Sequence, residues 1–323
     1  MDNNKKTLVS ICCITYNHER FISQCLDGFL MQNVDFPSEI VISDDCSTDN
    51  TKKIIDTYVS KYPAIFKDVS PSKNLGSMKN FFHTLSKCTG KYIAICDGDD
   101  YWIDENKLQM QVEFLENNPE YGICYTKSKQ YNQSMQKFNK KSIGADFDGF
   151  EDLLKIGNRI PTLTTVYRKD LLDKYQKEIQ PSNKGWLMGD YPMWLYFSHE
   201  SEIKFFDKDT AVYRVLDNSA CHSVDIDKEI LYRKSIYEVR DFYSKKYDIN
   251  IEERDENKEL FYIFYRKNIK KYTNENYEEM RILFKKIINK TNKDIIIYLF
   301  SCNCFFFRLF RFTIKLCKQI NLN

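Results

Sequence analysis

The residues best suited to chemistry are three aspartates close together, Asp97, Asp99 and Asp100, with Gly98 between the first two. They follow an apolar run of strand length, Tyr92 to Cys96. Carboxylates this close repel one another, so their charged forms need a cation or strong hydrogen-bond donors nearby. Such oxygens suit a hard divalent cation, which can in turn hold a diphosphate. The alternative is a solvated turn that caps the next helix.

A second acidic pair, Asp44-Asp45, follows the short apolar run Ile40 to Ile42. An Asx-turn or a helix cap would explain the pair, but the segment from Ser47 to Asp49 can already cap the next helix. The pair is therefore available to a ligand, because a carboxylate can accept hydrogen bonds from a base N–H or a ribose hydroxyl. Acids after two buried strands favour a ligand site over a solvated turn.

Asp190 lies at the expected start of a helix, directly before Tyr191-Pro192. A helix cap with an early proline explains it structurally. A rigidly placed carboxylate can also act as a general base that deprotonates an attacking hydroxyl. The two roles are compatible, so the sequence leaves both open.

Two further sets of side chains are ambiguous. Trp102, Trp186 and Trp194 fit a platform for stacking sugars and a buried aromatic core equally well. His222 is a candidate metal ligand, although an ordinary surface histidine is the simpler interpretation.

Alternating elements must position these residues. Apolar runs of strand length and amphipathic helical stretches alternate four times in the first 115 residues, which predicts an α/β fold with a mostly parallel sheet flanked by helices. Ligands of such sheets bind beyond the carboxyl ends of the strands. We therefore expect Thr15–Asn17, Asp44–Asp49 and Asp97–Asp100 to meet in one crevice. Thr15-Tyr16-Asn17 is no P-loop, and no glycine-rich fingerprint opens the first helix, which disfavours dinucleotide and P-loop chemistry.

The later chain is less regular. Lys204–Phe206 and Ala211–Arg214 resemble a closing hairpin, and charged helices are expected from about residue 225 onward. Because one core usually stops growing at about 250–300 residues, we expect a catalytic domain over residues 1–225 and a helical region over 226–323.

The net charge of +2 is unevenly distributed. From Lys228 to Asn323 there are 21 Lys and Arg residues against 13 Asp and Glu, and from Arg281 onward nine against one. In the last part, apolar residues interleave with the cations Arg308, Arg311, Lys315 and Lys318. This pattern predicts a basic helix at a membrane interface, with packing onto the protein as the alternative. A basic excess in so apolar a segment disfavours a nucleic-acid partner.

Several cysteines, including Cys12, Cys13, Cys96 and Cys124, fall in strand-like apolar runs, and none forms a pair with zinc spacing. We therefore expect reduced thiols in a cytosolic protein. The first apolar run has the length of a strand and not of a signal peptide, and there is no run of about 20 apolar residues. The expected location is cytoplasmic, peripheral on the inner face of the cell membrane.

Four segments together resemble the family 2 glycosyltransferases, which have the GT-A fold. They are Val9-Ser10-Ile11 with Thr15-Tyr16-Asn17, Ser43 to Asp49, Asn74-Leu75-Gly76, and Asp97 to Trp102. Their order, spacing and places at strand ends match over about residues 7–225. Cys46 stands where the family usually has Gly, and Ile14 where Pro is common; neither departure removes a functional side chain.

The resemblance implies roles for the matched residues. Thr15 and Tyr16 would flank the base of a nucleotide sugar, and Asp45 would bind its uracil or ribose side. Asp97 and Asp99 would form the DxD motif, and Asp99, alone or with Asp100, would bind Mn²⁺ or Mg²⁺ through the diphosphate. The full set expected at the nucleotide sugar is Thr15, Tyr16, Asn17, Asp45, Asn74, Asp97 and Gly98. The segment from Gly189 would supply Asp190 as the catalytic base, and we expect Trp102, Trp186 and Tyr191 in the acceptor region.

The function expected from this resemblance is metal-dependent, inverting sugar transfer from a nucleotide diphosphate donor, a UDP-sugar, to a hydroxyl of a glycan or lipid-linked glycan in surface polysaccharide synthesis. A nucleotidyltransferase is one alternative, but it would need a Gly/Lys-rich phosphate loop that His18-Glu19-Arg20 does not provide. A non-catalytic module that binds sugar nucleotides or glycans is another; Asp190 beside the acid cluster argues against it.

Overall fold

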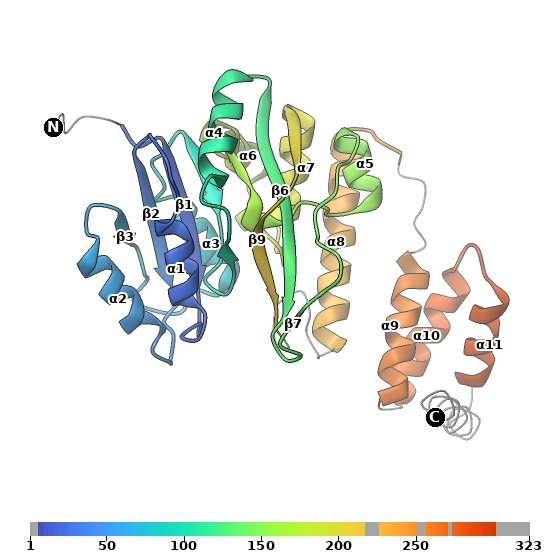
Figure 1. Ribbon diagram of the computed structural model, residues 1–323. Helices are drawn as coiled ribbons and strands as arrows, with labels where there is room; N and C mark the ends of the chain where they lie inside the picture. Colours follow the sequence, from blue (N-terminus) through green and yellow to red (C-terminus); the bar gives the residue numbers. More distant parts are fainter. Residues whose placement is uncertain (1–5, 217–225, 251–255, 271–272, 302–323) are drawn as a thin grey trace. The chain divides into compact units, whose positions relative to one another are not determined.

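The computed structural model describes residues 6–216, 226–250, 256–270 and 273–301 (Figure 1). The chain divides into two compact units: unit 1 is Met1–His222 with Glu238–Ile249, and unit 2 is Ser223–Tyr237 with Asn250–Asn323. The expected ranges of 1–225 and 226–323 differ from this division mainly in the second part of α8 (Ile226–Lys246), which belongs to unit 1. Within the described residues, no helix combines the length and the apolar character that crossing a membrane requires.

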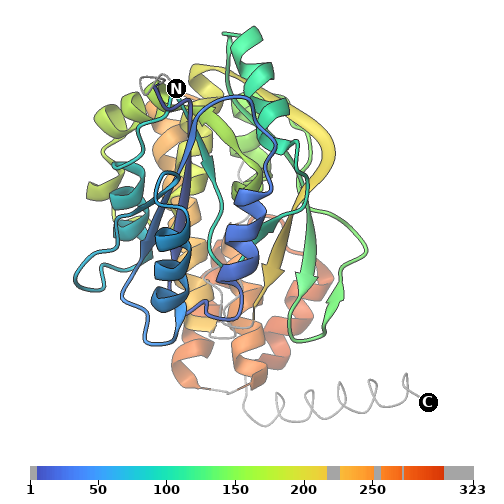
Figure 2. The same ribbon diagram turned by 60° about the vertical axis from the view of Figure 1, so that its left-hand side comes forward.

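The first part of unit 1 is a parallel sheet. The apolar runs form β1 (Val9–Thr15), β2 (Ser38–Asp44), β3 (Phe66–Asp68) and β4 (Tyr92–Ile95), paired in parallel in the order β3-β2-β1-β4. Helices α1 (Ile22–Leu30), α2 (Thr51–Lys61) and α3 (Ser77–Leu85) connect these strands and flank the sheet (Figure 2). Because helices cover such sheets on both faces, β1 and β4 are buried along most of their length. The expected strand–helix alternation is confirmed here.

Beyond β4 the sheet is mixed. β8 (Val166–Arg168) is antiparallel to both β4 and β6 (Tyr121–Asn132), whereas β9 (Glu202–Val215) is parallel to β6 and antiparallel to β5 (Tyr101–Trp102). β7 (Lys137–Phe138) pairs antiparallel with β6. The α/β fold is confirmed, but the parallel arrangement is limited mainly to the first four strands.

The prediction of a hairpin around residues 204–214 was wrong. Both apolar runs belong to the single strand β9, whose register against β6 jumps from Phe206 to Asp209. The polar residues between the runs are therefore accommodated in an irregularity of one strand and do not form a turn.

Four more helices and the second part of α8 complete unit 1: α4 (Lys107–Asn117), α5 (Gly149–Ile156), α6 (Lys169–Ile179) and α7 (Asp190–Glu200). Short 3₁₀ helices span Thr162–Thr164 and Pro181–Asn183. In α8, the Tyr243 hydroxyl donates to the Pro192 carbonyl at 2.8 Å, and Arg240 Nε donates to the Leu154 carbonyl at 2.8 Å. These bonds attach the second part of α8 to α5 and α7.

Unit 2 contains the first part of α8, α9 (Glu256–Lys270), α10 (Asn274–Lys286) and α11 (Asn292–Ser301). These helices pack around an apolar cluster that includes Phe261, Met280 and Ile297. Asp294 is fully buried in this unit and is held by Lys258 at 2.8 Å and the Tyr262 hydroxyl at 2.6 Å. Burial opposes ionisation of Asp294, but these hydrogen bonds prevail and its pKa lies below the usual range. The expected basic tail beyond residue 301, like His222, lies outside the described residues.

Candidate active site

The acid loop, residues Asp97–Asp100, leaves the carboxyl end of β4 and lies against the end of β1. The Gly98 amide donates to the Ile14 carbonyl at 2.9 Å. A Cβ atom on Gly98 would lie 2.7 Å from Thr15 Oγ1, so only glycine permits this approach. Within the described chain, the Thr15 hydroxyl is buried and has no hydrogen-bond partner. An unpaired buried hydroxyl beside an acid loop is a polar group available to a ligand.

Electrostatics connect the acid loop to α7. Asp97 is half-buried, and its pKa is raised to about 8, first by desolvation and then by the negative charges of Asp99 and Asp190. Asp97 and Asp99 come from the end of β4, whereas Asp190 begins α7. The fold therefore brings together carboxylates that lie about 90 residues apart in sequence.

Asp99 and Asp100 have different surroundings. The Asp99 carboxylate lies 3.9 Å from His18 Nε2 and is 21% exposed. Asp100 is buried, and its Oδ1 accepts a hydrogen bond from the Arg214 backbone amide at 2.7 Å. Burial and then the Asp99 charge raise the pKa of Asp100, while Arg214 acts in the opposite direction. One oxygen of Asp100 is thus engaged by the protein, and the Asp99 carboxylate is more open.

The acid loop fits a hard divalent cation by the chemistry of its donors. Several carboxylates repel one another there, and a cation would relieve that repulsion. Among the described residues, no group of three or more His, Cys, Asp or Glu side chains is arranged to hold a metal ion alone. A cation here would therefore also need oxygens from a bound ligand, such as a diphosphate.

The carboxylate of Asp45, directly after β2, is bound by the protein at both oxygens. Its two oxygens accept hydrogen bonds from the backbone amides of Leu75 at 2.7 Å and Gly76 at 2.9 Å. Asn74 Nδ2 donates to the Asp45 carbonyl at 2.8 Å. Gly76 has φ of 80°, a conformation that favours glycine. Asp45 and Asn74, both expected at the nucleotide sugar, therefore lie together and fasten the loop of residues 74–76.

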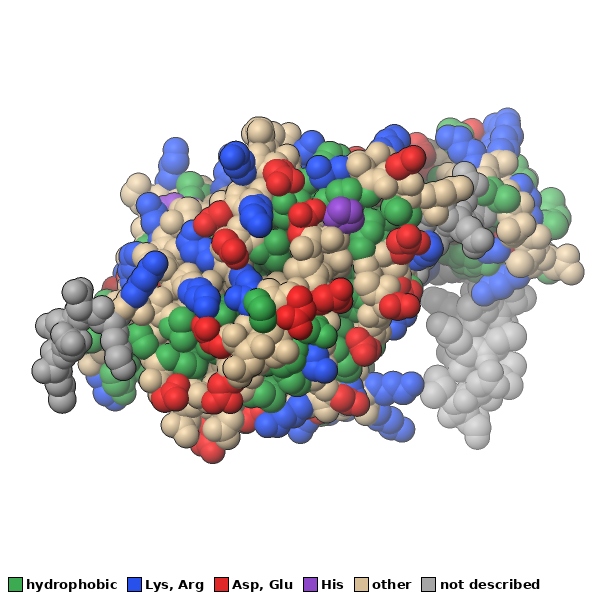
Figure 3. Space-filling view, turned by 90° about the horizontal axis from the view of Figure 1, so that it is seen from above, with side chains coloured by type: hydrophobic (Ala, Val, Ile, Leu, Met, Phe, Trp, Pro, Cys, Tyr) green, Lys and Arg blue, Asp and Glu red, His purple; other side chains and the backbone are tan. Residues whose placement is uncertain are grey.

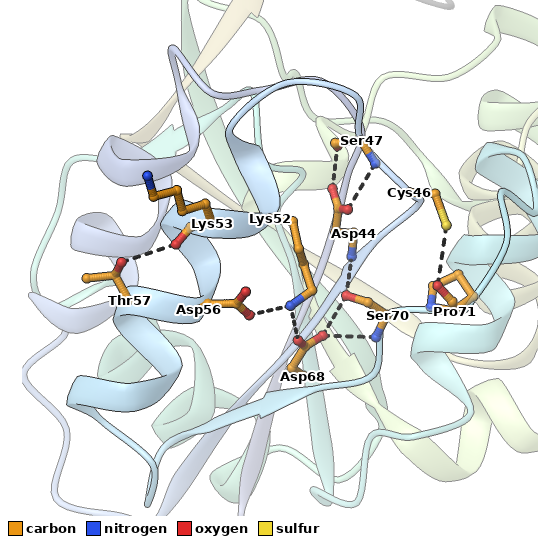
Figure 4. A network of polar contacts seen from close by, with 10 residues as sticks. All are labelled: Asp44, Cys46, Ser47, Lys52, Lys53, Asp56, Thr57, Asp68, Ser70 and Pro71. Carbon is orange, nitrogen blue, oxygen red and sulfur yellow. Dashed lines mark hydrogen bonds and ion pairs between the residues drawn. The ribbon is translucent and has the colours of Figure 1, made fainter.

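Asp44 belongs to a separate polar network (Figure 4). Its carboxylate accepts hydrogen bonds from the Ser47 amide and hydroxyl, and its own amide donates to Ser70 Oγ at 2.9 Å. Asp68 accepts from Ser70 and pairs with Lys52 at 3.1 Å. Burial raises the pKa of Asp68, but hydrogen bonds from Ser70 and Lys52 outweigh it and the pKa is lowered. The network fixes the chain between β2 and β3.

The segment after β1 carries Tyr16 and Asn17. Tyr16 is 45% exposed. Asn17 adopts φ of 57°. Its side-chain oxygen accepts a hydrogen bond from the Thr48 backbone amide at 2.8 Å, and its own backbone amide donates to Ser47 Oγ at 2.8 Å. These hydrogen bonds join the segments that follow β1 and β2, as expected if the polar loops meet at one edge of the sheet.

Asp190 is the first residue of α7, after Gly189 as the N-cap. Its Oδ2 accepts hydrogen bonds from Thr162 Oγ1 at 2.8 Å and Asn158 Nδ2 at 3.2 Å, and its Oδ1 accepts from the Tyr191 amide at 2.7 Å. The carboxylate is therefore oriented by three donors.

The aromatic residues expected near an acceptor are buried. Trp102 is 2% exposed, and its Nε1 donates to the Leu163 carbonyl at 2.8 Å. Trp186 packs on Phe242 and Tyr243 in unit 1 and is 7% exposed. Tyr191 is 2% exposed. These rings pack inside the protein, so their assignment to an acceptor site stays a prediction.

Sequence reasoning did not single out four residues that contact the site: His18, Asn158, Thr162 and Arg214. Arg214 alone left a signal, since an arginine within the apolar run of β9 is unusual for a buried strand. Its contacts with Asp99 and Asp100 join positions more than 110 residues apart, which no local pattern encodes.

Comparison with known families decides the class. The family model "Glycosyl transferase family 2" matches residues 10–176, which include the acid loop and the segments after β1 and β2. The chain belongs to glycosyl transferase family 2. This glycosyltransferase is also 34% identical over 222 residues to the uncharacterized protein Rv1520 of Mycobacterium tuberculosis. That match covers 68% of the chain and 62% of the relative's length.

Solved structures share the fold of this glycosyltransferase. S. aureus TarS 1-349 in complex with UDP-GlcNAc superposes with a TM-score of 0.52 at 17% identity, covering 87% of this chain and 82% of that one. The mannosyltransferase PcManGT from Pyrobaculum calidifontis, in complex with GDP-Man and Mn²⁺, gives a TM-score of 0.50 at 15% identity, covering 88% and 74%. The expected family and its GT-A architecture are therefore confirmed.

Proposed function

We propose that this glycosyltransferase moves a sugar from a UDP-sugar donor to a hydroxyl of a glycan or lipid-linked glycan in surface polysaccharide synthesis. The observation that carries the proposal is the electrostatic interaction of Asp97 with both Asp99 and Asp190. It puts groups suited to a diphosphate's counter-ion beside a group suited to accept a proton. UDP-GlcNAc in the TarS complex supports a uridine donor through likeness of fold.

The residues proposed for Mn²⁺ or Mg²⁺ are Asp99 and Asp100, with Asp97 completing the DxD motif. When bound, the cation would offset the negative charge that grows on the departing diphosphate. The Mn²⁺ in the mannosyltransferase complex supports this choice of cation. The free oxygens of the acid loop, rather than a complete protein cage, are what we expect for a cation that shares its ligands with a nucleotide.

Asp190 is the proposed general base. Hydrogen bonds from Thr162 and Asn158 to Oδ2 and from the Tyr191 amide to Oδ1 hold its carboxylate in one orientation. It takes the proton of the acceptor hydroxyl as that oxygen bonds to the anomeric carbon and the bond to the diphosphate breaks. Attack from the side opposite the leaving group inverts the anomeric configuration.

The donor nucleotide is proposed to lie over the ends of β1 and β2. The exposed Tyr16 ring can stack on the base, and the unpaired Thr15 hydroxyl can donate a hydrogen bond to the ligand. Asn17, Asp45, Asn74 and Gly98 hold the surrounding loops, and each carboxylate oxygen of Asp45 retains a lone pair for the uracil or ribose. The buried Trp102, Trp186 and Tyr191 are proposed to shape the acceptor side by packing.

We further propose attachment to the cytoplasmic face of the cell membrane through the chain beyond residue 301. In α11, Ile295, Ile296 and Leu299 are 40%, 47% and 59% exposed, which supports an apolar contact next to that segment. On the face of the molecule in Figure 3, acidic and basic side chains are interspersed over unit 1. That mixture supports the proposal that nucleic acid is not a partner.

Membrane attachment is tested by sedimentation with vesicles containing anionic lipid. Leu299→Glu should reduce binding, whereas Leu231→Glu, at another exposed leucine of unit 2, should not. A full chain that ignores the vesicles would refute this part of the proposal.

The catalytic proposal is tested with a panel of sugar nucleotides and Mn²⁺, measuring the released nucleoside diphosphate for the unmodified chain, Asp190→Asn and Asp99→Asn. We expect release from a UDP-sugar that Asp190→Asn suppresses without loss of donor binding, whereas Asp99→Asn impairs metal and donor binding together. Pyrophosphate release from a nucleoside triphosphate and a sugar phosphate would instead indicate a nucleotidyltransferase. Binding without turnover would indicate a non-catalytic module.

A further inference from the structure

Arg214 places a buried positive charge behind the acid loop. Its side chain lies at the end of β9, and the residue is 5% exposed. The guanidinium donates through Nη1 to the carbonyl oxygen of Asp99 and through Nη2 to Oε1 of Gln24 on α1. The backbone of Arg214 also donates to the Asp100 carboxylate at 2.7 Å. One residue thus binds the loop at two successive positions.

Two aromatic rings confine the guanidinium. Arg214 Cζ lies 4.4 Å from the centroid of the Tyr101 ring and 5.0 Å from that of Phe21. Cation–π contacts of this kind strengthen when water is excluded. The planar group is therefore held between α1, β5 and β9 with little freedom to turn toward another partner.

Arg214 binds the main chain of Asp99 and not its carboxylate. An arginine beside a carboxylate commonly forms a bidentate pair, which would occupy both carboxylate oxygens. Here the guanidinium binds the main-chain carbonyl of Asp99, and within the described residues the only Lys, Arg or His side chain that comes within 4 Å of the Asp99 carboxylate is His18, at 3.9 Å. The Arg214 guanidinium therefore supports the main chain of the loop and leaves the Asp99 carboxylate available to a ligand.

We propose that Arg214 is a positioning residue that fixes the acid loop from behind, so that its carboxylates, that of Asp99 above all, remain available to a divalent cation and the diphosphate of a nucleotide. This inference rests on the proposed function of the acid loop. It assigns Arg214 no contact with the sugar or the acceptor. Its loss should therefore weaken the contribution of the metal to nucleotide binding and leave metal-free binding largely unchanged.

The experiment measures the dissociation constant of UDP with the full chain, once with MnCl₂ and once with EDTA. In the unmodified chain Mn²⁺ should tighten UDP binding. In Arg214→Met that tightening should fall by about tenfold, a change of about 1.4 kcal/mol. Gln24→Ala, which removes one exposed acceptor of the guanidinium, should produce a smaller loss of the same kind while the fold is kept.

Lys204→Met is the matched control, because Lys204 is another β9 cation over aromatic rings, 5.8 Å from Phe114 and 5.7 Å from Phe206, away from the acid loop. It should retain the full effect of Mn²⁺. Equal weakening with and without Mn²⁺ in the Arg214 and Gln24 variants would overturn the inference, as would an unchanged effect of Mn²⁺ in Gln24→Ala. Failure of Mn²⁺ to improve UDP binding in the unmodified chain would instead refute the proposed metal and donor site itself.

Discussion

The ends of β2 and β4 carry aspartates in equivalent places but in opposite states. After β2, both Asp45 oxygens accept backbone hydrogen bonds, from Leu75 and Gly76. After β4, no hydrogen bond to the Asp97 carboxylate is found within the described chain, and the charges that act on it are those of Asp99 and Asp190, also acids. The same side chain is satisfied by the protein at one strand end and frustrated at the other.

This difference separates stability from function. A carboxylate that accepts good hydrogen bonds stabilises the fold, because its loss leaves backbone amides without their acceptor. A carboxylate crowded by like charges is unfavourable until a ligand or cation arrives, which is typical of functional sites. Asp190 is oriented by three donors, and its charge also acts on Asp97.

The largest effect is expected at Asp190. Asp190→Asn should lower kcat by about 10²–10⁴-fold, the usual contribution of a general base, because an amide cannot accept the proton. Donor affinity, measured by equilibrium binding, should stay the same. Asp170→Asn, at the exposed start of α6, is the control and should have normal turnover. Wild-type kcat in Asp190→Asn would contradict the assignment.

A second substitution tests whether the hydrogen-bonded Asp45 at the end of β2 stabilises the fold. Asp45→Asn should lower the free energy of unfolding by about 1–3 kcal/mol, because the amide nitrogen of asparagine would face a backbone N–H donor. Urea denaturation measures this. Asp99→Asn, in the loop after β4, should lower the free energy of unfolding by less than about 0.5 kcal/mol in metal-free buffer. Equal losses of unfolding free energy in Asp45→Asn and Asp99→Asn would contradict the difference between the ends of β2 and β4.

Thr162→Val should reduce kcat by about tenfold, because it deletes one charge-assisted hydrogen bond to Asp190 while keeping the side-chain shape. Asn158 and the Tyr191 amide would still hold the carboxylate. Steady-state kinetics should show the loss in kcat and not in the donor KM. A loss confined to the donor KM would indicate that Thr162 serves binding and not the base.

The smallest effect is a gain of stability. The pKa of Asp97 is about 8 in the folded protein against a reference value of 3.8, so the folded state binds a proton more tightly than the unfolded state. Stability from this group is present at low pH and falls as pH rises from about 4 to about 8. Asp97→Asn should remove that fall. With EDTA present, it should raise Tm at pH 8 by about 2–4 °C, the shift that about 1 kcal/mol produces in a chain of roughly this size.

Scanning calorimetry at pH 4.5 and pH 8 checks the Asp97 prediction, since the gain should be smaller at the lower pH. Asp56→Asn, on the exposed side of α2, serves as the control substitution of an exposed carboxylate. A Tm that falls at pH 8 in Asp97→Asn would show that the carboxylate is stabilised, and not frustrated, in the folded state.

Local sequence determined the parallel part of the sheet. Continuous apolar runs followed by amphipathic helices can be satisfied only by strands that are covered on both faces, so β1, β2, β4 and the polar ends of these strands were predictable. The motifs around Thr15, Asp45 and Asp97 were predictable for the same reason, because they directly follow those strands. The single strand β9 was missed, since polar residues inside an irregular strand look like a turn.

Only the tertiary structure decided which aspartates are satisfied. The sequence shows Asp45 and Asp97 after similar apolar runs, and nothing local reveals that the amides of residues 75 and 76 reach one of them. The support of Asp99 by Arg214 and the approach of Asp190 to Asp97 likewise depend on sheet order. Residue types and short spacings fix what a side chain can do, whereas its partners come from segments far away along the chain, and these partners set its charge and its availability.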